Sequence, residues 1–204
     1  MSMDEINFIA HSNTIVINLY AIVFIMLVVG YVLYRQIDKL NNKTFTGEEE
    51  DEVEERKYRK FSDYSILIQF SSVISVLGVS IVLSTTMNIY LILIGMIFII
   101  ITYFLQLNMI RLLQKVYQER NLPNLSDPDY AEKLLKVSDK GERHVMLHGF
   151  YKAYNLLNVL IIFAIVGATI YSMTTDHSQI FSIFLMVIVL LITNGKYMLT
   201  VRNK

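Results

Sequence analysis

The 204-residue sequence contains no cysteine and only two prolines. The absence of cysteine excludes disulfides, thiolate metal sites and cysteine nucleophiles. The 18 basic residues balance the 18 acidic residues, so the chain carries no bulk charge that would attract nucleic acid. No Gly-rich phosphate loop, DNA-reading helix or Ser/His/Asp arrangement stands out either. We therefore expect no nucleic-acid partner and no cofactor.

The N-terminus also lacks basic residues. Its first 14 residues contain neither Lys nor Arg and carry Asp4 and Glu5, which is the wrong charge for the n-region of a signal peptide, so we expect the first apolar segment to be retained. Hydrophobic residues make up 54% of the chain and the mean hydropathy is +0.46. These values are too high for a soluble domain of this size and indicate a membrane protein.

Five stretches are long and apolar enough to cross a hydrocarbon core of about 30 Å, which takes about 20 helical residues. Four of them contain no Asp, Glu, Lys, Arg or His, and the fifth contains only Lys196 of these, near one end. We predict an all-α, multi-spanning helical membrane protein, with a single integral membrane domain over residues 1–204. The expected spans are residues 15–34, 64–84, 87–107, 154–173 and 179–199.

The basic residues indicate the orientation of these spans. Residues 35–63 contain seven, residues 108–153 contain eight and the C-terminal end contains three, while the N-terminus and the two short links contain none. Since Lys and Arg next to spans stay on the cytoplasmic side, we expect the N-terminus outside, the C-terminus inside and both long segments in the cytosol. There the basic residues suit an anionic inner leaflet. Tyrosines near the predicted inner ends agree with this, because tyrosine prefers the headgroup region; they include Tyr31, Tyr34, Tyr64 and Tyr154.

The second cytosolic segment predicts short amphipathic helices at the inner surface. Pro123 and Pro128 break the helical continuation of the third span. A short helix is expected over residues 129–138, with a stop at Gly141, and a second helix from Glu142 leads into the fourth span. The apolar face of the short helix would comprise Tyr130, Leu134 and Val137.

Glu142, His144 and His148 form an E-x-H-x-x-x-H pattern, with the two histidines on one helix face. A zinc site needs three or four ligands, and the same residues serve equally as the polar face of a surface helix, which we favour. His11 and His177 fall on the other side of the membrane in this topology and cannot complete the site. We therefore predict no metal, and these three residues are the candidates if one binds.

Residues 76–86 and 165–175 form a weak internal repeat, which aligns Gly78 with Gly167. Each copy is followed by a short outer turn and another span. Two hairpins of the same orientation would be parallel repeats, an arrangement that some transporters use. Because few residue types fill membrane spans, chance and duplication both remain open.

Small residues on the spans predict places where helices approach closely. Ser71, Ser75 and Gly78 fall on one face at i, i+4 and i+7, and Ala164 and Ala168 offer a similar flat surface. We predict helix packing or partner contact at Ser71, Ser75, Gly78, Ala164, Gly167 and Ala168.

Around residues 128–158 the sequence resembles an uncharacterised group of small multi-spanning membrane proteins of Gram-positive bacteria, catalogued as domain of unknown function 3169. The resemblance rests on the charged stretch Asp139 to Arg143, the entry Tyr151-Lys152-Ala153-Tyr154 to the fourth span, and the order of spans. It implies a multi-pass protein of a bacterial plasma membrane. It transfers no catalytic or binding residue.

The spans contain almost no ionisable groups, which disfavours coupled transport by this chain alone. Our leading prediction is a non-enzymatic accessory, regulatory or immunity-type partner of another membrane protein, or a protein that associates with itself. We expect the partner to dock at the cytosolic stretch of residues 138–155. The alternative is a transporter or permease subunit built from two parallel helical hairpins, and a membrane-embedded metal-dependent enzyme is the third.

Overall fold

The structure is a computed structural model that describes residues 3–41, 48–116, 129–175 and 177–202. Within these ranges it is helical with no strand, and five helices are long and apolar enough to cross a membrane. The prediction of an all-α, multi-spanning protein is confirmed, while its sidedness and the limits of its spans stay predictions. The helices are α1 (Met3–Asn41), α2 (Glu48–Ser84), α3 (Ile89–Val116), α4 (Tyr130–Val137), α5 (Lys140–Thr174) and α6 (Ile180–Arg202).

The described residues divide into two compact units, one within Met1–Val137 and the other within Ser138–Lys204. The first unit contains the bundle α1–α3 together with α4, and the second is the hairpin of α5 and α6. The single domain predicted over residues 1–204 stays a prediction.

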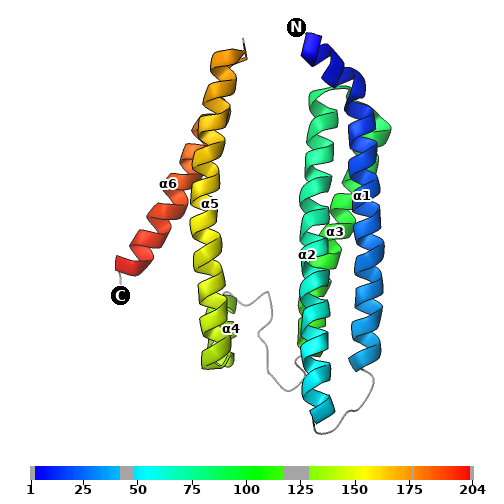
Figure 1. Ribbon diagram of the computed structural model, residues 1–204, viewed down its shortest axis with the longest axis vertical. Helices are drawn as coiled ribbons and strands as arrows, with labels where there is room; N and C mark the ends of the chain where they lie inside the picture. The colour runs from blue at the N-terminus through cyan, green and yellow to red at the C-terminus, as the bar shows by residue number, and fades with distance from the viewer. Residues whose placement is uncertain (1–2, 42–47, 117–128, 176, 203–204) are drawn as a thin grey trace. The chain divides into compact units, whose positions relative to one another are not determined.

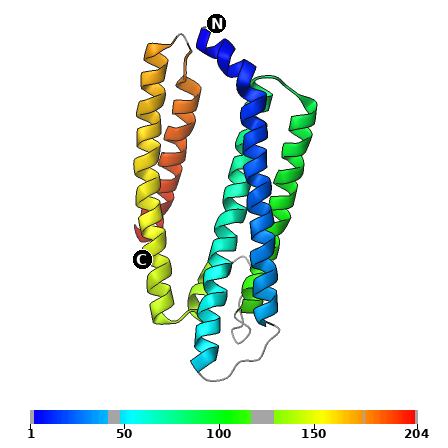
Figure 2. The ribbon, with the colours of Figure 1, turned by 45° about the vertical axis from the view of Figure 1, so that its right-hand side comes forward.

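Helix α2 is the centre of the first bundle, since it packs along both α1 and α3 while those two touch each other much less (Figures 1 and 2). Two apolar clusters hold the bundle, one toward each end. The first comprises Ile37, Tyr64, Ile68 and Leu112, and the second comprises Val16, Tyr20, Val82 and Leu91.

The charged segment before the second span is part of α2. Its side chains form i,i+4 ion pairs, Arg56 with Glu52 at 3.3 Å and Arg59 with Glu55 at 2.5 Å, and such pairs support an exposed helix. The solvated segment and the span therefore form one continuous helix of 37 residues. At 1.5 Å per residue it is about 55 Å long, well beyond the roughly 30 Å of a hydrocarbon core.

A tight turn joins α2 to α3. Met87 has φ of 50°, in the left-handed region that favours glycine, and its backbone N–H donates to the carbonyl of Val82 at 2.9 Å. The hydroxyl of Thr86 donates to the side-chain oxygen of Asn13 at 2.8 Å, which ties the turn to α1. The third helix begins at Ile89, two residues after the predicted start of the span.

Helix α4 is the short surface helix expected before the fourth span. Tyr130 and Leu134 are half-buried and Val137 is 39% exposed, and the apolar face that we predict for these three residues stays a prediction. Lys136 pairs with Glu132 at 2.7 Å and lowers the pKa of that carboxyl, while burial raises the pKa of Tyr130. The predicted breaks at Pro123 and Pro128 lie outside the described residues.

Helix α5 begins abruptly at a capping box. The carboxylate of Asp139 accepts from the backbone N–H of Glu142 at 2.8 Å, and the backbone N–H of Asp139 donates to the carboxylate of Glu142 at 3.3 Å. These reciprocal bonds provide acceptors for backbone N–H groups that have no hydrogen-bond partner within the helix at its first turn. Gly141 lies inside the first turn, so the predicted stop there was wrong. The break falls instead between α4 and Lys140, and α5 then continues unbroken to Thr174.

Polar side chains join α5 to α6. The amide of Asn194 donates to the side-chain oxygen of Asn158 at 2.9 Å and accepts from the hydroxyl of Tyr154. The ring of Tyr154 also lies 5.2 Å from that of Tyr197. In an apolar solvent such interhelical hydrogen bonds hold helices together.

Candidate functional site

The serine and glycine face of α2 lies inside the first bundle. Ser71 and Ser75 are fully buried, and each hydroxyl donates to a carbonyl one turn earlier in α2, at 2.7 Å. Gly78 is buried on the same face, where a Cβ atom would overlap the ring of Tyr20 from α1. Small side chains with internally satisfied hydroxyls let α1 pack closely here.

The side chain of Tyr20, from α1, packs against both α2 and α3. Its ring lies over Gly78 of α2, its hydroxyl points at Gly95 of α3, and its ring meets that of Phe98 edge to face at 5.6 Å. A Cβ atom at Gly95 would overlap both the Tyr20 hydroxyl and a methyl group of Val79. The hydroxyl is buried and has no hydrogen-bond partner among the described residues. Tyr20 is therefore held by shape, between two glycines.

The corresponding small residues of α5 lie in a different environment. Ala164 and Gly167 are exposed and Ala168 is half-buried. A Cβ atom added at Gly167 would meet nothing within 4 Å, whereas one at Gly78, its counterpart in the repeat, would overlap Tyr20. None of the described residues of α5 or α6 is buried. Packing or partner contact at the α5 positions stays a prediction.

The two histidines of the predicted metal pattern lie in the first turns of α5. The rings of His144 and His148 stack 6.0 Å apart at 9°, and both side chains are exposed. The third candidate, Glu142, bonds the backbone of Asp139 in the capping box. No group of three metal-ligating side chains occurs among the described residues. The pattern therefore offers two histidine side chains, while its glutamate takes part in a helix cap, and a zinc site needs three or four ligands.

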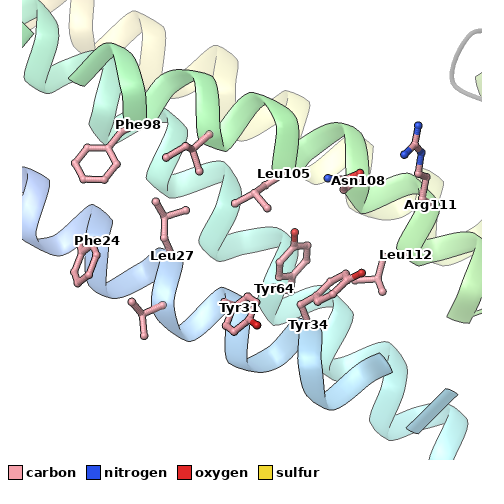
Figure 3. A pocket seen from close by; sticks show the side chains of 12 residues that line it. Phe24, Leu27, Tyr31, Tyr34, Tyr64, Phe98, Leu105, Asn108, Arg111 and Leu112 are labelled. Atoms are coloured by element: carbon pink, nitrogen blue, oxygen red, sulfur yellow. The ribbon is translucent and has the colours of Figure 1, made fainter. Parts of the chain in front are cut away.

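A partly open groove of about 760 Å³ lies between α1 and α3 (Figure 3). Its floor is formed by the buried side chains of Tyr64 from α2 and Leu112 from α3. Aliphatic and aromatic side chains form most of the walls; they include Phe24, Leu27 and Val28 of α1 and Phe98, Ile101 and Leu105 of α3. Its volume is within the range of about 300–1,000 Å³ that is typical of small-molecule sites.

Polar groups gather at one end of this groove. Arg111, Asn108 and Leu112 from α3 lie at that end with Tyr34 from α1, Tyr31 lies nearer the middle, and Phe24 and Phe98 lie at the other end (Figure 3). The guanidinium of Arg111 extends away from α1, at the margin of the groove (Figure 3). Arg111 is the one charged side chain among the described residues that line the groove. The apolar stretch of α3 ends at Met109, two residues before Arg111. The groove thus has a cationic mouth and an apolar length.

Five long apolar helices, two of them joined by a hydrogen bond between the side chains of Asn194 and Asn158, define a multi-spanning helical membrane protein. The chain belongs to the family described as a protein of unknown function (DUF3169), whose family model matches residues 1–201. No curated protein and no solved structure matches it.

Proposed function

We propose that this protein is a non-enzymatic component of the bacterial plasma membrane that works by association with another membrane protein, through the α5–α6 hairpin. The main observation behind this proposal is the difference in packing at Gly78 and Gly167, the two glycines that the internal repeat aligns. Gly78 is covered by Tyr20 of a third helix, whereas the position of Gly167 on α5 is open. A helix from a partner would complete the α5 face as α1 completes that of α2.

The hairpin itself supports this proposal. Asn158, near the middle of α5, and Asn194 join α5 to α6 together with Tyr154, so the two helices are held as one element. The small residues Ala164 and Gly167 lie on α5 further along from that connection, and their backbone is accessible to another helix. Close backbone approach at small residues is a principal source of helix association in lipid.

A transporter or permease subunit is the alternative. It requires a polar pathway between the helices, and the groove between α1 and α3 is instead apolar over most of its length. A metal-dependent enzyme would need further ligands beside His144 and His148, because Glu142 serves the helix cap. Both observations support association over transport or catalysis.

Purification of the tagged full chain from native membranes in mild detergent tests the proposal. We expect a stoichiometric membrane protein to co-purify, and Gly167→Leu to release it. Gly195→Leu on α6 is the matched control, since a Cβ atom there also meets nothing within 4 Å. Recovery of the chain alone, with neither a partner nor a homo-oligomer, would refute association. Retention of the partner by Gly167→Leu would place the contact elsewhere than on the α5 face.

The proposed sidedness has a separate test, because the chain has no cysteine. Glu50→Cys lies in the charged segment that we assign to the cytosol, and Ser178→Cys lies in the link between α5 and α6 that we assign to the outside. An impermeant thiol reagent applied to intact cells should label only Ser178→Cys. Labelling of Glu50→Cys under these conditions would overturn the orientation.

A further inference from the structure

We infer that the groove between α1 and α3 is a binding site for an anionic membrane lipid, with its headgroup at Arg111 and an acyl chain along the apolar walls. The inference is independent of the partner proposed for the α5–α6 hairpin. It rests on how charge and apolar surface are distributed within one groove (Figure 3).

The polar end of the groove suits an anionic headgroup. Arg111 provides a guanidinium whose donors match phosphate geometry. Asn108, three residues earlier on α3, adds an amide toward this end, and Tyr34 of α1 adds a hydroxyl group. No carboxylate occurs among the described lining residues, so nothing at the groove wall competes for the cation. A zwitterionic headgroup would bring its own cation next to Arg111 and would gain less.

The remainder of the groove suits an acyl chain. Arg111 lies 13 residues after Phe98, which is about 20 Å along a helix, and the α3 lining between them is aliphatic at Ile101 and Leu105 before it becomes polar at Asn108. The rim side chains Phe24 and Ile101 are exposed, so the groove opens toward the lipid that surrounds a membrane helix. A lipid therefore enters from the side and lies parallel to α3.

The size of the groove disfavours a protein helix as its occupant. A helix with its side chains is about 10 Å wide, so two turns already fill roughly 850 Å³, more than the 760 Å³ of the groove. A helix would therefore lie over the rim, whereas an extended acyl chain fits between the walls.

Brominated lipids test the site in a chain that contains no tryptophan. Phe98→Trp places a fluorescent reporter in the groove. Leu77→Trp is the control, because Leu77 is 50% exposed and does not line the groove. It also lies at a similar height along the bundle, since its neighbour Gly78 packs against Tyr20 and Tyr20 packs against Phe98. Each full-length variant is reconstituted in phosphatidylcholine vesicles that contain either brominated phosphatidylglycerol or brominated phosphatidylcholine. The quantity measured is the ratio of the two lipids' apparent binding constants, obtained from tryptophan quenching.

We expect the groove reporter to prefer phosphatidylglycerol about fivefold, the factor that corresponds to the roughly 1 kcal/mol of one basic residue at an anionic membrane surface. The control reporter should show a ratio near one. Arg111→Gln should abolish the preference at the groove, and Arg111→Lys should retain it. Arg35→Gln, an equal charge change on an exposed residue of α1 that does not line the groove, should leave it unchanged.

Several results would overturn the inference. Equal quenching by the two lipids would show that the groove does not select anions, and a preference that survives Arg111→Gln would show that Arg111 does not select them. A preference lost equally in Arg35→Gln would assign it to the general surface potential. A groove reporter shielded from both lipids, relative to Leu77→Trp, would mean that protein covers the groove. An unchanged far-ultraviolet circular dichroism spectrum of each variant shows that its helices are folded, so a change in lipid preference is not caused by unfolding.

Discussion

The Gly95→Ala substitution should destabilise the first bundle, whereas the same change at Gly167 should not. The added methyl group at Gly95 would overlap the hydroxyl of Tyr20 and a methyl group of Val79. Tyr20 has no room to retreat, because its ring is in contact with Gly78 on one side and Phe98 on another. The overlap must therefore be relieved by displacement of α1 or α3.

The magnitude follows from a comparison of the two glycines. Overpacking a well-packed interior by a methylene typically costs about 1–3 kcal/mol, and replacing glycine by alanine within a helix returns up to about 1 kcal/mol. At Gly167 only the second effect operates, since a Cβ atom there meets nothing within 4 Å. The propensity contribution cancels in the difference, so Gly95→Ala should be about 1–3 kcal/mol less stable than Gly167→Ala.

The assay is reversible unfolding of the full chain in mixed micelles of a mild detergent and dodecyl sulfate, followed by circular dichroism. Gly78→Ala should behave like Gly95→Ala. The double variant Tyr20→Leu with Gly78→Ala should recover part of the loss, because the smaller side chain leaves space for the methyl group. If Gly95→Ala and Gly167→Ala unfold at the same detergent fraction, Tyr20 is not wedged between the helices and the reasoning fails.

For three further substitutions the structure predicts whether stability rises or falls. Tyr20→Phe removes a buried hydroxyl that has no partner among the described residues and should stabilise the bundle by about 1 kcal/mol in the same assay; a loss of stability would reveal a hydrogen bond there. Asn194→Leu removes the bonds to Asn158 and Tyr154 and should weaken the α5–α6 hairpin by about 0.6–1.7 kcal/mol, seen as easier proteolysis of the link; unchanged cleavage would contradict it. Met87→Gly should stabilise the α2–α3 turn by about 1 kcal/mol, because glycine adopts a φ of 50° without the cost that methionine carries; no gain in unfolding midpoint would show that the turn is unstrained.

The sequence alone predicts the helices and their number well, because composition and length are sufficient to recognise an apolar span. It does not predict which helix face meets which neighbour. In lipid the faces that pack against protein and those that meet acyl chains are both apolar, so periodicity carries little information. The spacing of Ser71, Ser75 and Gly78 selected a face that the structure buries, but nothing in the pattern identified Tyr20 as its partner.

The candidate sites show the same limit. Gly95 and Asn194 are isolated small or polar residues within spans, and only the distances to Tyr20 and Asn158 give them a role. Arg111 contributed to the orientation as one cytosolic charge among several, and its position at the mouth of a groove depends on how α1 and α3 diverge. Conversely, the charges around Glu142 suggested a ligand set, whereas the local geometry makes that residue part of a helix cap.

The unbroken course of α5 has a mechanical consequence. Its 35 residues form a rod of about 52 Å, which is some 20 Å longer than the hydrocarbon core. Within the described helix neither a proline nor a change of helix type separates the charged first turns from the apolar span (Figure 1). Any tilt imposed on the span by membrane thickness or a bound neighbour is carried directly to Arg143 and His144 as a sideways displacement. The exposed first turns of α5 therefore move whenever the apolar part of the same helix tilts.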